Sequence, residues 1–141
     1  MKILGFNLTK ISAEKISSKL ENVKINTNID ISEISEAKAD EMIKLKEDIL
    51  TIKFTFILDY TDYAKIEFQG ILILAIDSKD SKEILKNWKN DKKISDEFRI
   101  SLFNLILRKS TLRALQLEEE IGIPLHLPLP SLKYPDKKDN N

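Results

Sequence analysis

The residue types that most often carry chemistry are sparse in this sequence. The single histidine, His126, stands between two leucines with a proline two residues away on either side, and cysteine is absent. A zinc site needs several such ligands and a general base needs an orienting partner, and the sequence shows neither around His126. The sequence therefore predicts a surface or packing histidine without a catalytic or metal role, one that substitution leaves without consequence.

Carboxylates are numerous, but they fall in mixed charge runs. The two clearest runs are residues 36–48 and 118–120, and a solvated face explains such runs better than an acid–base pair does. None of the three glycines belongs to a phosphate-binding loop, and no serine stands in a nucleophile elbow. These patterns favour a protein that is not an enzyme and that uses no cofactor or metal.

The balance of charge argues against two classes of partner. Lys plus Arg and Asp plus Glu number 23 each, so the concentrated basic field that nucleic acid requires is missing. No apolar run reaches the length of a membrane span, and the N-terminus lacks the layout of a signal peptide. We therefore expect a cytoplasmic protein that binds no nucleic acid and does not insert into a membrane. The basic residues Arg99, Arg108, Lys109 and Arg113 are interpreted as a solvated helix face.

The elements that must position these residues follow from hydrophobic periodicity. Alternation of apolar and polar residues predicts strands over 3–11, 22–34, 49–60 and 64–76, the last two joined by a turn at Thr61 and Asp62. Residues 12–21 are expected to form a connection, and residues 36–48 a loop or a short exposed helix. We expect one domain over residues 1–132 and a polar, disordered tail over 133–141.

From Ser78 the apolar period lengthens to that of a helix. Ser81 is expected to cap a short helix that packs Trp88 on the core, with an interface role for this tryptophan as the alternative. Ser95 opens a long helix that ends at Gly122, and its apolar stripe comprises Phe98, Leu102, Leu105, Ile106, Leu112, Leu115 and Ile121. The predicted fold class is α+β: a four-stranded antiparallel sheet, two C-terminal helices and an extended proline-rich apolar segment.

Two surfaces carry more apolar side chains than one chain needs. Ile71 and Ile73 make the second face of the last strand apolar, and Phe103 and Leu107 widen the stripe of the long helix. Either a helix of the same chain or another subunit must cover such faces, because large exposed apolar patches are a liability. We predict a homo-oligomer, a dimer or a tetramer, with these four residues at its interface.

The last apolar stretch, residues 123–132, combines three prolines with large aliphatic residues. Proline neither continues a helix nor donates to a sheet, so the stretch is expected to be extended. Ile123, Leu125, Leu127 and Leu129 then share one edge. Three interpretations remain open: a cover for the core, a polyproline ligand for an aromatic groove, or one wall of an apolar groove that takes unfolded chain.

The order of the elements resembles the SecB export-chaperone fold. In that family the last long helix breaks at glycine and proline into an extended apolar stretch, and the matching residues here are Gly122, Pro124, Leu127 and Pro128. The first strand, I-L-G-F-N-L, is similar too, and the resemblance covers residues 2–132. Members that serve the export ATPase are acidic, whereas this chain is neutral. The resemblance therefore points to a general or dedicated chaperone akin to those of lineages without the export pathway.

The resemblance implies an ATP-independent holdase, a dimer of dimers whose surface grooves bind extended apolar segments of unfolded or nascent polypeptides. The expected client-binding residues are Phe6, Leu8, Ile123, Leu125, Leu127, Leu129 and Leu132. The alternative is an oligomeric assembly module that binds one folded partner protein. A small-ligand or enzymatic role with His126 at the site is a third option.

Overall fold

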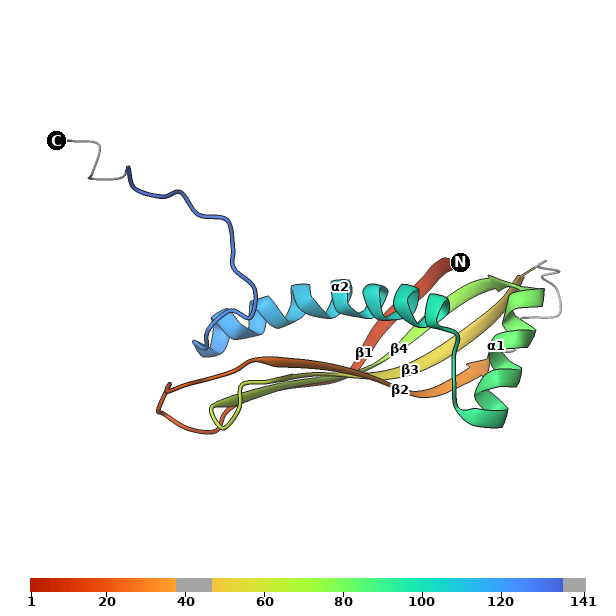
Figure 1. Ribbon diagram of the computed structural model, residues 1–141, viewed down its shortest axis with the longest axis horizontal. Coiled ribbons are helices and arrows are strands. Elements are labelled where there is room, and N and C mark those ends of the chain that lie inside the picture. Colours follow the sequence, from red (N-terminus) through yellow and green to blue (C-terminus); the bar gives the residue numbers. More distant parts are fainter. Residues whose placement is uncertain (38–46, 136–141) are drawn as a thin grey trace.

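The computed structural model describes residues 1–37 and 47–135 as four strands followed by two helices (Figure 1). The elements are β1 (Lys2–Lys15), β2 (Asn26–Glu36), β3 (Glu47–Asp59), β4 (Ala64–Asp77), α1 (Ser78–Asp91) and α2 (Asp96–Ile121). The strands form one antiparallel sheet in the order β1-β4-β3-β2. The predicted α+β class, with its four-stranded sheet before two helices, is confirmed.

The hairpin of β3 and β4 supplies most of the core. From Leu50 onward, every second side chain of β3 and most of those at alternate positions of β4 are buried, and the largest fully buried ones are Leu50, Ile52, Phe54, Phe56, Leu58, Ile66, Phe68, Leu72 and Leu74. Phe56 stacks on Phe68 across the hairpin, with ring centroids 5.7 Å apart. Burial of each large apolar side chain stabilises the fold by about 1.5–3 kcal/mol. The alternation read from the sequence is thus the main source of stability.

Gly70 allows an aromatic ring to lie close to β4. A Cβ atom at this position would come within 2.5 Å of Cζ of Phe54 and 2.9 Å of the backbone oxygen of Asn7. Phe54 occupies that space and stacks on Phe6 of β1, with ring centroids 5.3 Å apart. This packing fixes β1 against the hairpin.

β1 continues beyond its predicted end. Residues 12–15 still pair with the first residues of β4, from Ser12 opposite Glu67 to Lys15 opposite Ala64. The prediction of a connection over 12–21 was therefore wrong for its first four residues, because a polar stretch at a sheet edge can remain in the ladder.

α2 lies across one face of the sheet, and α1 packs at one end of it (Figure 1). The side chains that α2 buries are Leu102, Ile106, Ser110, Ala114, Leu117 and Glu118. Leu112 is two residues from both Ser110 and Ala114, which is about 200° around a helix, and it is 63% exposed. Its predicted place in the buried stripe was therefore wrong. Ser95 accepts a hydrogen bond from the amide of Phe98 as the N-cap, and Gly122 ends the helix with φ of 68°, as predicted.

α1 begins earlier than predicted. Asp77 is its N-cap and Ser81 is a buried residue within the helix, because β4 leads into α1 without an intervening loop. Trp88 is 9% exposed and belongs to the core, which confirms its predicted packing role. The ammonium group of Lys92 lies 5.2 Å from the centroid of its ring.

The opposite face of the sheet carries Ile71 and Ile73, both half-buried. The side chains that α1 and α2 bury join the core with Leu72 and Leu74, on the other side of β4. In the described residues, therefore, neither helix covers Ile71 and Ile73.

Two predicted segments fall on undescribed residues. The loop or short helix expected at 36–48 lies largely in 38–46, and part of the expected tail lies in 136–141; both ranges are outside the described residues. Among the residues that are described, no helix has the length and apolar character needed to cross a membrane.

Candidate functional site

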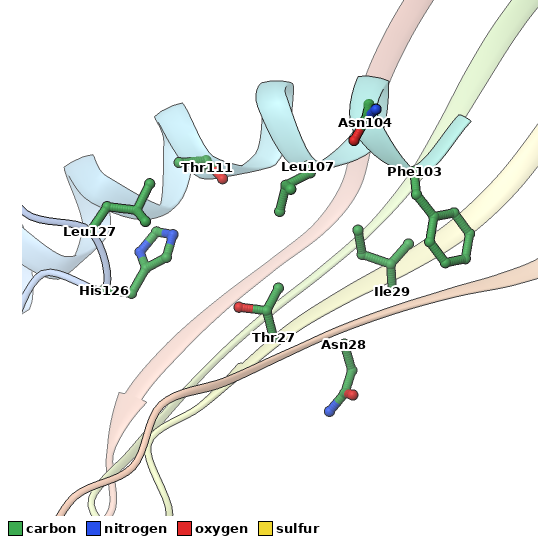
Figure 2. A pocket seen from close by; sticks show the side chains of 9 residues that line it. All are labelled: Thr27, Asn28, Ile29, Phe103, Asn104, Leu107, Thr111, His126 and Leu127. Carbon is green, nitrogen blue, oxygen red and sulfur yellow. The ribbon is translucent and has the colours of Figure 1, made fainter. Parts of the chain in front are cut away.

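A groove with a volume of about 580 Å³ opens between β2 and α2 (Figure 2). Its lining residues come from β2, from α2 and from the segment after α2: Thr27, Asn28, Ile29, Phe103, Asn104, Leu107, Thr111, His126 and Leu127. None of them is Lys, Arg, Asp or Glu. The groove is therefore lined by apolar and uncharged polar side chains, with one imidazole at the end formed by the segment after α2.

The alternation of β2 aims its apolar side chains at this groove. Thr27 and Ile29 point towards α2, whereas Asn28 points away (Figure 2). β2 is also an edge strand, since it pairs only with β3 in the part of the chain that the structure describes. An edge strand presents backbone N–H and C=O groups in the spacing that another extended chain matches.

The third wall of the groove follows Gly122 and turns back beside the last turns of α2 (Figure 1). Ile123 donates its backbone N–H to the carbonyl of Glu118 at 3.0 Å, which closes the end of the helix. Pro124 and Pro128 exclude helix from this wall. The burial of Ile123 and polar contacts hold this wall in place.

One buried carboxylate supplies those contacts. Glu118 is 0% exposed, and its Oε1 atom accepts hydrogen bonds from the Tyr60 hydroxyl and, at 3.0 Å, from the backbone N–H of His126. Nδ1 of His126 lies 2.5 Å from the same oxygen, and the carbonyl of Pro124 lies 2.8 Å from the Tyr60 hydroxyl. We call Tyr60, Glu118 and His126 the Glu118 node. It joins the end of β3, the last turn of α2 and the segment after it.

The electrostatics of the node favour a fixed arrangement. Burial raises the pKa of Tyr60 well above its usual range, and the hydrogen bond to Glu118 and the charge of that carboxylate act in the same direction. The phenol is therefore a neutral donor at physiological pH. The second carboxylate oxygen, Oε2 of Glu118, has no hydrogen-bond partner among the described residues, so all the contacts converge on Oε1.

The node contains the groups of an acid–base pair but no nucleophile. No hydroxyl group within the described ranges forms a hydrogen bond with the His126 ring. The same ranges also hold no cluster of three or more residues suited to bind a metal ion. The arrangement orients an imidazole and holds a chain segment in place.

The predicted client-binding residues do not lie together. Leu127 lines the groove, Leu125 is half-buried beside it, and Leu129 and Leu132 are 58% and 100% exposed. Ile123 is 5% exposed and packs in the core. Phe6 and Leu8 are half-buried on β1, which β4 and β3 separate from β2, so the structure does not bring them to this groove.

The four predicted interface residues lie on two surfaces. Phe103 and Leu107 line the groove, whereas Ile71 and Ile73 lie on the other face of the sheet. The pairing of Phe103 with β2 was not predictable, because the apolar stripe of a helix does not reveal which strand it faces.

The sequence patterns did not predict the Glu118 node. Glu118 belongs to a run of three glutamates, which was expected to be a solvated face, and it is instead fully buried. The available signal was its position one turn after Ala114 and two turns after Ser110, on the buried side of α2. His126 gains through Glu118 the orienting partner that its sequence neighbours do not provide.

Comparison with known proteins adds the fold family. No protein-family model and no curated protein matches the sequence. Among solved structures, the chain is similar to the SecB-like chaperone Rv1957 of Mycobacterium tuberculosis, in complex with a ChAD peptide from the antitoxin HigA1, Rv1956. The TM-score is 0.51 at 14% sequence identity, over 96% of this chain and 92% of that chain.

The fold is SecB-like. The resemblance read from the order of strands and helices is thereby confirmed at the level of the fold. The groove between β2 and α2 and the Glu118 node are features of this SecB-like chain's own residues.

Proposed function

We propose that this SecB-like chain is an ATP-independent holdase that binds extended apolar segments of unfolded or nascent polypeptides in the groove between β2 and α2. The single observation that carries the proposal is the character of that groove: apolar and uncharged polar side chains line it without Lys, Arg, Asp or Glu, and an edge strand borders it. Unfolded chains expose apolar side chains together with unpaired backbone groups, and this groove offers a match for both.

The wall formed by the segment after α2, which lines the groove through His126 and Leu127, suits this role. Its prolines exclude helix and lack backbone N–H donors, which disfavours pairing of the wall with itself or with β2. Leu127 and Leu129 remain 45% and 58% exposed, so they are accessible to a client. Transfer of a client's leucine from water into such a groove contributes about 1.5–3 kcal/mol when it is complete.

The structural neighbour supports a polypeptide as the bound partner. Rv1957 is solved with a peptide from an antitoxin, so a chain with this fold binds a peptide segment. The same fact favours the second candidate, an assembly or interaction module dedicated to one partner protein. Promiscuity separates the two, because a holdase binds many unfolded chains and ignores native ones, whereas a dedicated module selects one partner.

We further propose that two or more copies associate through the face that carries Ile71 and Ile73. These half-buried isoleucines lie on the side of the sheet away from both helices, where a second subunit would remove them from water. Phe103 and Leu107 line the groove, and we assign them to client binding. Light scattering at tens of micromolar protein measures the mass, and a strict monomer would contradict this part of the proposal.

Suppression of aggregation tests the holdase directly. A chemically unfolded test protein is diluted into the chaperone and its light scattering is followed, with the same protein in its native state as a control for selectivity. Leu107→Ser, in the groove, should weaken the suppression, and the matched variant Leu112→Ser on the opposite side of α2 should not. Equal behaviour of the two variants would argue against this groove as the binding site.

A further inference from the structure

One nitrogen of the His126 ring has a partner and the other has none. The side chain is 5% exposed, and its Nδ1 atom lies 2.5 Å from Oε1 of Glu118. Nε2 forms no hydrogen bond with any described residue. Figure 2 shows the ring between Leu127 and Thr27, with a ring nitrogen directed into the groove. A polar atom of an almost fully buried side chain is thus left free at the groove wall.

The contacts of Glu118 determine where the ring carries its proton. Oε1 already accepts the Tyr60 hydroxyl and the backbone N–H of His126, which is the behaviour of an ionised carboxylate. A carboxylate oxygen 2.5 Å from Nδ1 then requires the proton on Nδ1. In a neutral imidazole with a protonated Nδ1, the lone pair remains on Nε2.

We propose that His126, as a neutral imidazole, is the polar anchor of the groove: Glu118 holds the proton on Nδ1, and Nε2 accepts a hydrogen bond from a main-chain N–H of the bound polypeptide. This inference rests on the proposed function and adds to it the group that the groove recognises.

The surroundings of His126 explain why an acceptor is needed there. Ile29, Phe103, Leu107 and Leu127 supply the apolar part of the groove, beside the uncharged polar side chains of Thr27, Asn104 and Thr111, so a client's N–H group loses water on entry. A buried donor left without an acceptor is strongly unfavourable, and one well-placed acceptor removes that penalty.

The anchor recognises the backbone, with one consequence for specificity. Every residue except proline carries a main-chain N–H, so clients of unrelated sequence satisfy Nε2 equally. Proline at the position opposite Nε2 lacks the donor. We therefore expect bound segments to avoid proline at that one position.

Nuclear magnetic resonance of the single histidine tests the first half of the inference. With [15N]histidine the whole chain shows one imidazole. In the free protein we expect a protonated-type Nδ1 signal and an unprotonated-type Nε2 signal. When an unstructured leucine- and serine-rich peptide of about ten residues, spanning roughly 33 Å when extended, is added to saturation, Nε2 should move upfield. The Nδ1 signal should stay in place. A ring protonated on Nε2 in the free protein would overturn the inference.

N-methylation of the peptide tests the second half without altering the protein. Methylation of one backbone nitrogen at a time removes one donor at a time. At one position we expect the affinity for the wild-type protein to fall about tenfold, a value typical for loss of one buried hydrogen bond. In His126→Phe, which keeps a ring but no acceptor, methylation at that position should cost nothing further.

The outcomes separate the anchor from the groove. In one outcome, the peptide binds wild-type protein without a change in the Nε2 signal and without a larger loss of affinity at any one methylated position. That result would contradict the role of His126 and leave the holdase proposal intact. Failure of the wild-type protein to bind any such peptide would overturn the proposed function and the anchor with it. If His126→Phe does not fold, the signals and the methylation profile of wild-type protein still decide the question.

Discussion

Two apolar regions of this chain are held in place by opposite means. In the β3–β4 hairpin, every second side chain is buried, and the backbone ladder repeats the same contacts along both strands. In the segment after α2, the aliphatic side chains of Leu127 and Leu129 remain about half exposed, and the chain is fixed by contacts that converge on one carboxylate oxygen. The stabilising contacts are spread along two strands in the first region and concentrated at one atom in the second.

The difference suits the two roles. A core spreads its stabilisation over many closely packed side chains, so each truncation there lowers the stability of the fold, whereas a wall held at one point can keep its outer side chains free for a client. Substitutions in the hairpin should therefore lower mainly the free energy of unfolding. Substitutions of the exposed leucines after α2 should lower mainly the affinity for clients.

The largest loss of stability is expected in the hairpin. Phe56→Ala removes a fully buried ring that stacks on Phe68, and we expect the free energy of unfolding to fall by about 3–5 kcal/mol. Urea denaturation followed by circular dichroism measures the change. A loss below about 1 kcal/mol would contradict the assignment of the hairpin as the main source of stability.

Removal of the node should have the next largest effect. Glu118→Ala leaves the donors of His126 without their acceptor and the Tyr60 hydroxyl with only the carbonyl of Pro124, and we expect a loss of about 3 kcal/mol. Hydrogen exchange should show the amide of His126 losing its protection while the hairpin amides keep theirs. Glu118→Gln is the matched control, since it retains an acceptor oxygen and should cost only about 1–2 kcal/mol. Equal losses for the two variants would argue against the hydrogen bonds as the cause.

Alkaline pH offers a way to probe the same node through Tyr60. Its pKa is raised in the folded protein, while in the unfolded chain it ionises near the usual value of about 10. The folded state therefore keeps the proton that the unfolded state loses, and the contribution of Tyr60 is complete below pH about 10 and falls as the pH rises. Between pH 9 and 11 the stability advantage of wild-type protein over Tyr60→Phe should shrink by about 1.4 kcal/mol. A pH-independent difference would show that Tyr60 ionises equally in both states.

The same contrast explains why one region could be predicted from the sequence and the other could not. The hairpin was predictable because alternation from Leu50 to Tyr60 is a local pattern with a period of two, and the turn at Thr61 is adjacent in the chain. The node was not predictable, because Tyr60 and Glu118 are 58 residues apart in the chain. In addition, Glu118 is followed by two more glutamates, a pattern that is typical of surface residues.

The groove shows an intermediate case. The inward face of β2 and the apolar stripe of α2 were both predicted correctly in outline, except that Leu112 is exposed and Leu115 does not join the core. Which strand the stripe faces depends on how α2 crosses the sheet, and that crossing is set by tertiary packing. The sequence therefore indicated an apolar wall after α2 without indicating that Thr27 and Ile29 lie opposite it.

The smallest effect on stability is expected at the exposed wall itself. The double variant Leu127→Ser/Leu129→Ser removes side chains that are 45% and 58% exposed and leaves the contacts of Glu118 intact. We expect the free energy of unfolding to change by less than about 1 kcal/mol, as is usual for surface sites. Aggregation suppression should nevertheless weaken strongly, because the wall loses its apolar edge.

The matched control for that variant is Ile100→Ser/Leu112→Ser on the outer side of α2. These side chains are 59% and 63% exposed, so the two double variants remove similar apolar surface from positions of similar solvent exposure. Only the wall variant should lose activity, since only it changes the surface that meets a client. Three results would each contradict the division between core and wall: unfolding of the wall variant, full activity of the wall variant, or equal loss in the control. Unfolding would mean that these leucines stabilise the fold as the hairpin does, at about 2–5 kcal/mol for each truncation.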